Sequence, residues 1–444
     1  MKTRILFISL LVPLMAMCGK DPVDNPETQD PENQDPEVPE VVVNPDDAVA
    51  PQVKNGDRIL VTDPVVEQFI TTITYPERDY SYSAMKKGAE ADFLFEDFID
   101  EDGQPQKRRL ISPGKCDISP VYSIRWTKDT QSTEYTARLW EGDWSADYTL
   151  DPNPDDEVSF GYWLINNLRP NAHYSYEVKN GGSVVTSGEF DTYGHLHQLT
   201  FKPGSASGVR NARDLGGWKT KDGTKTVKYR KVYRGGRPEH INAKGIVEAK
   251  REGIKAELDL RGWSYKKENG AYVLDENGQK IKTDHDFLSQ SAFEGAEFLA
   301  PEIDEGYAQM LRDDKAKTRQ CMQFIMDMVD QDKPVYFHCS LGRDRTGTVA
   351  LLTLGVLGVD EGEISKEYEL TQFAPSGYSV SGGETTRMTR LNGVDYDGAA
   401  KFLWAYGKQD DGSYLPFKDC VEKYLLEIGI SADSIAKFRN NMLE

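Results

Sequence analysis

The stretch that decides the fold runs His338-Cys339-Ser340-Leu341-Gly342-Arg343-Asp344-Arg345-Thr346-Gly347. The apolar run before it, Pro334 to Phe337, indicates a short buried strand that ends at the histidine. After it, Thr346 to Leu357 is rich in Val, Ala and Leu and indicates a helix that stops at Gly358. The sequence therefore predicts a strand, a tight loop and a helix, which is the context that an anion-binding loop requires.

The composition of this loop points to a phosphate monoester as its target. A loop between a strand and the first turn of a helix can aim successive backbone N–H groups inward, at the positive end of the helix dipole. The same field favours the thiolate of Cys339 and lowers its pKa below the ~8.5 of a free cysteine. Arg345 offers a planar fork for two phosphate oxygens, which a lysine would not match. A core cysteine beside a helix that begins with arginine is the alternative, but it leaves the shared spacing of Cys, Gly, Arg and Thr unexplained.

Two sets of residues resemble a known family. The loop is similar to the signature of the cysteine-dependent protein tyrosine and dual-specificity phosphatases. The segment Val209-Arg210-Asn211-Ala212-Arg213-Asp214-Leu215-Gly216-Gly217 resembles the Asn-x-Arg-Asp-Leu-Gly-Gly opening of a bacterial branch, whose loop runs His-Cys-x-x-Gly-Lys-Asp-Arg-Thr-Gly. The similarity continues through Glu257 to Arg261 and Gly355 to Val359, and it covers about residues 205 to 444. Arg343 stands where this branch usually has Lys, so the substrate preference of the family does not transfer directly.

The resemblance implies a hydrolase that works through a cysteinyl-phosphate intermediate. Cys339 would attack phosphorus, while Arg345 and the backbone N–H groups of the loop would hold the equatorial oxygens. Thr346 would hydrogen-bond the sulfur and help it leave. The expected phosphate-binding residues are Ser340, Leu341, Gly342, Arg343 and Arg345, and the expected loop supports are His338, Arg213 and Asp214.

The leaving oxygen also needs a proton, and the sequence offers two main donors. The Trp-Pro-Asp motif of the mobile-loop tyrosine phosphatases does not occur in the chain. Asp344 within the loop and Asp259 at the end of the Asp-Leu-Arg segment are the best candidates, and the resemblance favours Asp344. The alternative role of Asp344 is to bind Arg213 or another arginine. Asp286 and Asp304 remain as further candidates for the donor.

The charge of the chain limits its partners. The formal net charge is −20, and no basic stripe with interleaved aromatics is present, which argues against nucleic-acid binding. An anionic substrate must therefore be attracted by a local basic pocket. The candidates for that pocket are Arg210, Arg213, Arg234, Arg237, Arg261, Arg343 and Arg345. No cofactor is expected for this chemistry, and the weak metal candidates His195-x-His197 and Asp284-His285-Asp286 are interpreted as solvated loop residues.

The first 50 residues indicate export. A basic Met1-to-Arg4 segment precedes an apolar run, Ile5 to Met17, that is too short to span a bilayer comfortably. Cys18 resembles a bacterial lipoprotein processing site, so we expect a signal peptide over 1–18 and lipidation of Cys18, with plain secretion as the alternative. Residues 19–50 are acidic and rich in proline, which predicts a disordered tether. The protein would be anchored to a bacterial membrane by its lipid, at the periplasm or the cell surface.

Residues 51–194 predict an all-β sandwich of the immunoglobulin or fibronectin kind, because short alternating segments are separated by Gly, Asp, Asn and Pro. Leu168-x-Pro170 followed by Tyr174 resembles the tyrosine corner of fibronectin type III domains, and Trp126 is the expected core tryptophan. Four further aromatic residues are interpreted as core filling rather than as a ligand-binding face: Trp140, Trp144, Tyr162 and Trp163.

Residues 195–444 predict an α/β phosphatase domain with a central, mostly parallel sheet flanked by helices. The pattern predicts a strand over 254–260, helices over 307–329, 418–428 and 432–443, and an inserted hairpin over 264–287. The hairpin is interpreted as a surface elaboration, with a lid over the site as the alternative.

Three functions follow from these observations. The first is a protein tyrosine or dual-specificity phosphatase. The second is a phosphoinositide or inositol phosphate phosphatase, because additional charge at Arg343 suits a polyanionic head group. The third is a non-catalytic surface protein whose sandwich binds an unknown ligand, although a pure binder has no reason to retain the thiol of Cys339.

Overall fold

The computed structural model describes residues 49–72, 95–99, 105–109, 119–129, 134–151, 156–201, 209–238, 241, 243–262, 266–268, 271–279, 281, 291–376, 387–388 and 393–444. The described residues cluster into one compact unit. Cys18 and residues 19–48 of the predicted tether lie outside them. None of the helices in these ranges is both long and apolar enough to cross a membrane.

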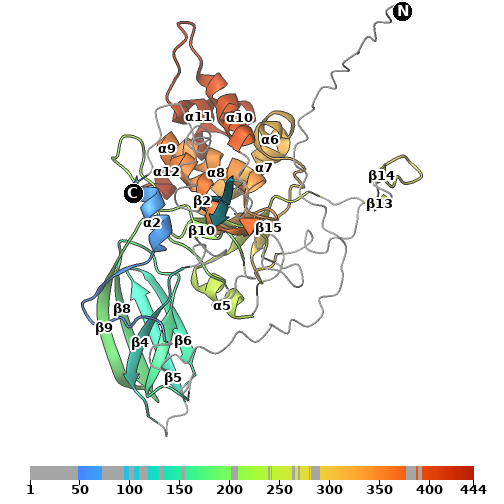
Figure 1. The fold of residues 1–444 in the computed structure, drawn as a ribbon. Coiled ribbons are helices and arrows are strands. Elements are labelled where there is room, and N and C mark those ends of the chain that lie inside the picture. The colour runs from blue at the N-terminus through green and yellow to red at the C-terminus, as the bar shows by residue number, and fades with distance from the viewer. Residues whose placement is uncertain are drawn as a thin grey trace, which may run out of the picture. The chain divides into compact units, whose positions relative to one another are not determined.

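The first half of the described chain contains two sheets that enclose one apolar core (Figure 1). A five-stranded sheet has the order β1-β9-β8-β5-β6, and β4 pairs with β7 in an antiparallel ribbon. In β5, buried and exposed residues alternate, as the period of a half-buried strand requires. The strands are β1 (Arg58–Leu60), β4 (Tyr122–Thr127), β5 (Tyr135–Glu141), β6 (Trp144–Leu150), β7 (Phe160–Ile165), β8 (His173–Asn180) and β9 (Ser183–Tyr193).

The core of this region is built around Trp126, as the sequence predicted. Its indole is 6% exposed and packs against the ring of Tyr135 at a centroid distance of 5.2 Å. Gly161 on the paired strand β7 makes room for it, because an added Cβ would lie 2.5 Å from the indole ring. Trp163 is also buried in this core, at 3% exposure.

The prediction that residues 51–194 are all-β is wrong at helix α2 (Pro64–Thr72). The side chain of Asp63 caps this helix by accepting hydrogen bonds from the backbone N–H groups of residues 65 and 66, at 2.9 and 3.2 Å. Its buried residues Val66, Phe69 and Ile70 have helical spacing and belong to the core of the second half of the chain. Two further strands of this region, β2 (Phe95–Ile99) and β3 (Pro105–Arg109), form an antiparallel hairpin.

The second half contains a five-stranded sheet of order β10-β11-β16-β12-β15. The pairing of β10 with β11 is antiparallel and the other three pairings are parallel, so the predicted mostly parallel sheet is present. The strand β16 is the third of the five, so its carboxyl end lies in the middle of the sheet edge, and it is buried over its whole length. The strands are β10 (Arg213–Asp214), β11 (Val232–Gly235), β12 (Ala256–Asp259), β15 (Glu297–Leu299) and β16 (Val335–His338).

Helices pack around this sheet (Figure 1). The predicted helix over 307–329 is divided at Asp314 into α6 and α7. The helices are α5 (Ala243–Arg251), α6 (Tyr307–Asp313), α7 (Lys315–Asp330), α8 (Asp344–Leu357), α9 (Glu361–Glu369), α10 (Gly393–Trp404), α11 (Phe417–Glu427) and α12 (Ala432–Met442), with 3-10 turns η2 (Leu370–Phe373) and η3 (Ala405–Gly407). Short antiparallel pairs join β13 (Lys267–Glu268) to β14 (Ala271–Tyr272), within the predicted hairpin, and β17 (Pro375–Ser376) to β18 (Arg387–Met388).

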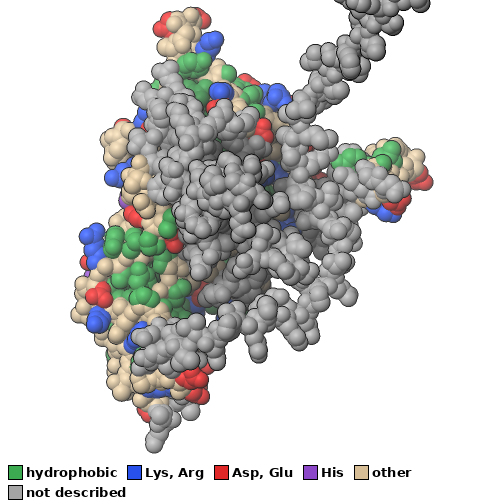
Figure 2. Space-filling view, viewed as in Figure 1, with side chains coloured by type: hydrophobic (Ala, Val, Ile, Leu, Met, Phe, Trp, Pro, Cys, Tyr) green, Lys and Arg blue, Asp and Glu red, His purple; other side chains and the backbone are tan. Residues whose placement is uncertain are grey.

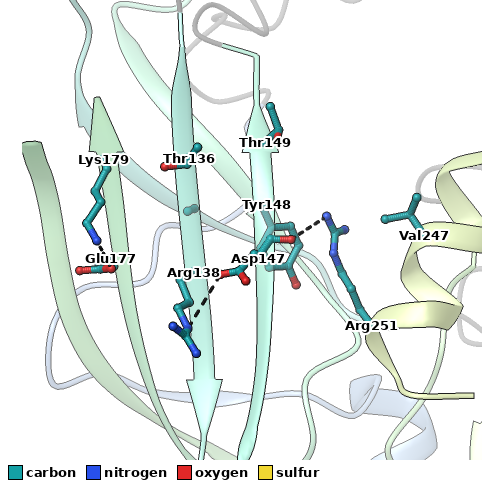
Figure 3. Close-up of a pocket in the computed structure, with 10 residues that line it drawn as sticks. Thr136, Arg138, Asp147, Tyr148, Thr149, Glu177, Lys179, Val247 and Arg251 are labelled. Carbon is teal, nitrogen blue, oxygen red and sulfur yellow. Dashed lines mark hydrogen bonds and ion pairs between the residues drawn. The ribbon is translucent and has the colours of Figure 1, made fainter. Parts of the chain in front are cut away.

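A hollow of about 600 Å³ lies where the outer face of β5, β6 and β8 meets α5 (Figure 3). The charged side chains that line it interact with one another and with the backbone. Glu177 pairs with Lys179 at 2.5 Å, Arg138 pairs with Asp147 at 3.8 Å, and Arg251 donates to the carbonyl of Asp147 at 3.2 Å. The hollow is therefore a satisfied polar surface.

Hydrophobic side chains also appear on the face of the β-sheet region turned to the viewer in Figure 2. The exposed large apolar residues of this region are Leu164 on β7 and Val184, Val185 and Tyr193 on β9. Scattered apolar side chains of this kind are ordinary on a folded surface.

Candidate active site

Within the ten-residue stretch, residues 339–343 form a loop between the end of β16 at His338 and the start of α8 at Asp344, so the predicted order of strand, loop and helix is present. Cys339 follows directly after β16 and is 3% exposed. Gly342 has a left-handed φ of +69°, and an added Cβ would lie 2.5 Å from the carbonyl group of Gly235. Only glycine therefore allows the loop to lie against the end of β11.

The carbonyl groups of this loop are held from behind. Asn211 donates from Nδ2 to the carbonyl oxygen of Gly342 at 2.8 Å and to that of Leu341 at 3.4 Å. Arg234 donates from Nη2 to the same Gly342 oxygen, and the N–H of Arg237 donates to the carbonyl of Ser340 at 3.1 Å. Peptide units held by their carbonyls on one side present their N–H groups on the other, as an anion-binding loop requires.

A buried ion cluster stands behind these contacts. Glu367 on α9 is 1% exposed and binds Arg213 at 2.7 Å and Arg234 at 2.8 Å. The expectation that these two arginines line a substrate pocket is wrong, because both are buried and paired. Arg261, with a side chain that is only 8% exposed, is also paired: it binds Asp259 at 2.6 Å. A guanidinium removed from water needs such a partner, so these residues organise the site from within.

The thiol of Cys339 is electrostatically prepared for ionisation. Burial alone would disfavour the thiolate, but the charge of Arg345 and a hydrogen bond from Thr346 outweigh it, so the pKa of Cys339 is lowered. The Thr346 hydroxyl is buried and has no hydrogen-bond partner within the described part of the chain, so it is available to the sulfur. Cys339, Arg345 and Thr346 thus lie together at the start of α8, and their catalytic roles stay predictions.

Arg345 is held by backbone carbonyls from two other segments. Its Nη1 lies 3.0 Å from the carbonyl oxygen of Ile303 and 3.5 Å from that of Leu260. The side chain is only partly buried. These contacts fix the direction of its fork beside the loop.

His338 lies behind Cys339 rather than in front of it. Its ring is fully buried, with Nε2 2.8 Å from Glu257 and Nδ1 3.2 Å from the carbonyl oxygen of Cys339. Burial opposes its positive charge, yet Asp259 and Glu257 raise the pKa of His338 above its ordinary value. The predicted loop-supporting position of His338 agrees with this geometry.

The two candidate proton donors have different environments. Asp259 is fully buried, and although burial opposes its ionisation, His338 and Arg261 lower its pKa. The side chain of Asp344 is 19% exposed and accepts two hydrogen bonds from Arg343, at 2.7 and 2.9 Å, and one from the Tyr307 hydroxyl. Sequence reasoning missed Tyr307, because nothing in a helix-forming pattern shows where a hydroxyl at its first residue points.

The remaining predicted residues lie around this centre. Asp214 accepts hydrogen bonds from the N–H groups of Gly216 and Arg230, both at 2.7 Å, and contacts His197 at 3.1 Å, so it holds a turn rather than the loop itself. Asp304 is exposed. Asp286 and the Asp284-His285-Asp286 group lie outside the described residues.

The interpretation of His195 and His197 as solvated loop residues is half wrong. His197 is fully buried between Asp214 and the carbonyl of Asn167, which lies 2.9 Å from Nε2. His195 is exposed and pairs with Glu67 of α2 at 2.6 Å.

Comparison with known proteins relates this chain to the tyrosine phosphatases. The tyrosine phosphatase family matches residues 205–444. A Cupriavidus necator protein assigned by its name to the tyrosine-protein phosphatases is 28% identical over 183 residues, which cover 39% of this chain and 62% of that protein. A tyrosine-protein phosphatase of Nostoc commune is 38% identical over 69 residues, covering 16% of this chain and 23% of the relative. The chain thus spans less than two thirds of either relative. The crystal structure of P. aeruginosa TpbA aligns with a TM-score of 0.26 and 16% identity, over 46% of this chain and 90% of that one.

Proposed function

We propose that this chain, which belongs to the tyrosine phosphatase family, is a protein tyrosine or dual-specificity phosphatase that forms a cysteinyl-phosphate intermediate. One observation carries the proposal. The pKa of the Cys339 thiol is lowered by Arg345 and Thr346 at the start of α8, in a loop whose carbonyls are tied back by Asn211 and Arg234. This arrangement combines a nucleophile with a site for a dianion.

The reaction proceeds in two displacements. In the first, the Cys339 thiolate bonds to phosphorus while the bond from phosphorus to the leaving oxygen breaks, and Asp344 protonates that oxygen. In the second, Asp344 takes a proton from the attacking water, the sulfur–phosphorus bond breaks, and inorganic phosphate leaves. Thr346 stabilises the departing thiolate through its hydrogen bond, and Arg345 stays on the equatorial oxygens throughout.

We assign the proton donor to Asp344 rather than to Asp259. Asp259 is enclosed and bound by Arg261, and its lowered pKa keeps it ionised, so it has no proton to give. Asp344 is partly exposed and is the first residue of α8, directly after the loop. Asp259 then serves, with Glu257, to orient His338 behind the nucleophile.

The surroundings of Arg343 favour phosphotyrosine over a phosphoinositide. Its guanidinium forms two hydrogen bonds to Asp344, so much of its charge is compensated. Arg213, Arg234 and Arg261 are also paired with buried carboxylates. A substrate with several phosphates would therefore meet less positive charge than the sequence alone predicts.

The function is tested by hydrolysis of p-nitrophenyl phosphate with the full chain and with Cys339→Ser. The variant should have no turnover while it still binds inorganic phosphate, because the loop N–H groups and Arg345 remain. Retained turnover in Cys339→Ser would exclude the covalent mechanism. A panel of phosphotyrosine peptides, phosphoserine peptides and phosphoinositide vesicles should rank the tyrosine peptides first. A higher kcat/KM for the vesicles would assign the second function instead.

For the first half of the chain we propose a fibronectin type III-like sandwich. Three features support it: two sheets around Trp126 whose pairings are antiparallel except for the parallel pair β1–β9, a sheet order that joins β5 and β6 to β8 and β9, and a hydrogen bond at the position of a tyrosine corner. In that bond the Tyr174 hydroxyl accepts from the N–H of Arg169, five residues earlier, at 2.9 Å. An experimental structure with a different strand order would refute this assignment.

A further inference from the structure

The two oxygens of the Asp344 carboxyl have unequal partners. Oδ1 accepts from Arg343 Nε at 2.7 Å and from the Tyr307 hydroxyl, whereas Oδ2 accepts only from Arg343 Nη2, at 2.9 Å, among the described residues. A carboxylate oxygen has two lone pairs in the plane of the group. Both lone pairs of Oδ1 are therefore occupied, and one lone pair of Oδ2 is left for a proton.

We infer that Tyr307 is a positioning residue that confines the transferable proton of Asp344 to Oδ2. The inference rests on the proposed function, in which Asp344 is the general acid. Without the Tyr307 hydroxyl, a lone pair of Oδ1 would become available, and the proton would be shared between two oxygens that point in different directions. Only one of them can face the leaving oxygen.

The direction of the Tyr307 hydroxyl is set by a second tyrosine. The hydroxyl oxygens of Tyr307 and Tyr368 lie 2.6 Å apart. Each phenol has one hydrogen, and that of Tyr307 goes to Asp344, so Tyr368 must be the donor between them. A hydroxyl that accepts a hydrogen bond donates more strongly. Tyr368 is itself fully buried and stacks on Tyr396, with ring centroids 3.9 Å apart.

The backbone keeps Tyr307 in this place at a conformational cost. Its φ is +57°, which a residue with a side chain rarely adopts. Its N–H donates to the Thr348 hydroxyl at 2.7 Å, and that hydroxyl donates to the carbonyl of Asp344 at 2.9 Å. Strain of this kind persists where neighbouring contacts over-determine a position, and it is typical of functional sites.

Two glycines allow the approach. A Cβ on Gly306 would lie 3.1 Å from the backbone nitrogen of Arg345, and a Cβ on Gly347 would lie 2.9 Å from the Tyr368 ring. The last glycine of the loop motif therefore makes room for the tyrosine that orients Tyr307.

The pH dependence follows from the groups that face Asp344. These are the cation Arg343 and the Tyr307 hydroxyl, which both bind its carboxyl group, and the Cys339 thiolate. Asp344 must carry a proton to act, so kcat/KM for a substrate that needs the acid falls as pH rises. A hydroxyl that donates to the carboxylate favours the charged form. Loss of that hydroxyl should therefore move the fall to higher pH.

The test compares the full-length wild type with Tyr307→Phe, and Tyr424→Phe serves as the matched control. Tyr424 is also buried, and its hydroxyl donates to the carbonyl of Leu311 at 2.8 Å on another part of the helical layer. On the low-pH plateau, Tyr307→Phe should lower kcat/KM for an alkyl phosphate by on the order of tenfold, the loss typical of one charge-assisted hydrogen bond. Turnover of p-nitrophenyl phosphate, whose leaving group needs no proton, should change little. The alkaline fall of the alkyl profile should move to higher pH.

A second variant, Tyr368→Phe, keeps the inference testable if Tyr307→Phe does not fold. Tyr368→Phe leaves the Tyr307–Asp344 bond in place but removes its polarising donor, so it should move the profile in the same direction by a smaller amount. An unmoved profile in both variants, with alkyl and aryl phosphates affected equally, would overturn the inference and leave the proposed function intact. Absence of any turnover in the wild type would refute both.

Discussion

Two carboxylates in this protein, one buried and one partly buried, each bind two arginines, and they lie in different regions. Glu367 on α9 binds Arg213 and Arg234 and is 1% exposed. Glu141 at the end of β5 binds Arg169 and Arg230, the latter at 2.5 Å, and is 12% exposed. The chemistry of the two clusters is the same, but their further contacts are not.

The difference lies in what the second arginine of each cluster reaches. Arg234 also donates to the carbonyl of Gly342, within the catalytic loop. Arg230 also donates to the Tyr174 hydroxyl at 3.1 Å and lies 4.0 Å from the centroid of the Trp144 ring, both in the β-sheet region. The Glu367 cluster therefore supports the site, whereas the Glu141 cluster fastens the β-sheet region to the phosphatase domain. We expect changes in the first to affect catalysis, and changes in the second to affect stability alone.

The largest effect is expected for Glu367→Gln. Two guanidiniums would remain buried without a carboxylate, which typically costs about 3–5 kcal/mol of unfolding free energy. The loop would also lose part of its support, and a misplacement of about 1 Å can lower the rate roughly 10²-fold. Denaturant unfolding and kcat/KM for p-nitrophenyl phosphate, both measured well below the melting temperature, check the two parts. Normal kcat/KM in the folded fraction would show that the cluster does not shape the loop.

Glu141→Gln is the matched change in the other cluster. Its partners are more exposed, at 22% for Arg169 and 11% for Arg230, so water replaces part of the lost interaction. We expect a loss of about 1–3 kcal/mol in unfolding free energy. The kcat/KM of the folded protein should stay within about twofold of the wild type. A kinetic defect as large as that of Glu367→Gln would mean that the two clusters are coupled.

The same contrast separates what the sequence could predict from what it could not. The loop was predictable because its residues are contiguous and its flanks have the periodicity of a strand and a helix. The partners of its arginines were not, since Arg213 and Glu367 are 154 positions apart and a sequence does not show which distant acid will meet which base. For that reason three of the seven arginines predicted for the substrate pocket are instead bound to buried carboxylates, namely Arg213, Arg234 and Arg261.

Helix α2 and the role of Tyr307 were also not predicted, because both depend on contacts with residues distant in the sequence. The spacing of Val66, Phe69 and Ile70 does indicate a helix, but it is short and stands among strand-like segments. Its packing partner Phe373, at a ring distance of 5.3 Å, lies about 300 residues away in the chain. Tyr307 fits the helical pattern that begins there, so periodicity explains its presence without revealing its contact with Asp344.

The exchange of Arg234 for lysine tests the same difference between the two clusters, with a smaller expected loss of kcat/KM than in Glu367→Gln. In Arg234→Lys the charge is retained, but one ammonium cannot reproduce the fork that binds both Glu367 and the Gly342 carbonyl. We expect kcat/KM to fall by about tenfold, the equivalent of one hydrogen bond to a charged group. Arg230→Lys is the control, and its kcat/KM should be unchanged. Equal kinetic losses in the two variants would contradict the assignment of the catalytic role to the Glu367 cluster alone.

The smallest effect concerns the pH dependence of stability. Burial opposes the charge of Glu141, but Arg169 and Arg230 lower its pKa below the ordinary 4.5. A carboxyl with a lowered folded-state pKa contributes stability that is complete above its unfolded pKa and is lost as pH falls through the folded value. His338 behaves in the opposite way, since its pKa is raised above 6.5, and its contribution is complete below that value and is lost as pH rises through the folded pKa. The unfolding free energy of the wild type should therefore decline at acidic pH, where Glu141 becomes neutral, and at pH above 6.5, where His338 loses its proton.

Glu141→Gln should remove part of the acid decline only. The difference in unfolding free energy between wild type and Glu141→Gln should be constant above about pH 5 and shrink below pH 4.5, since the wild-type carboxyl then becomes neutral like the amide. The decline above pH 6.5 should be the same in both proteins, because the charge of His338 is stabilised by Glu257 and Asp259 and not by the Glu141 cluster. Denaturant unfolding at half-unit steps from pH 3 to pH 8 measures both limbs. A difference that stays constant down to pH 3 would mean that Glu141 contributes through packing and not through its charge, and the likeness between the two arginine clusters would then be one of geometry alone.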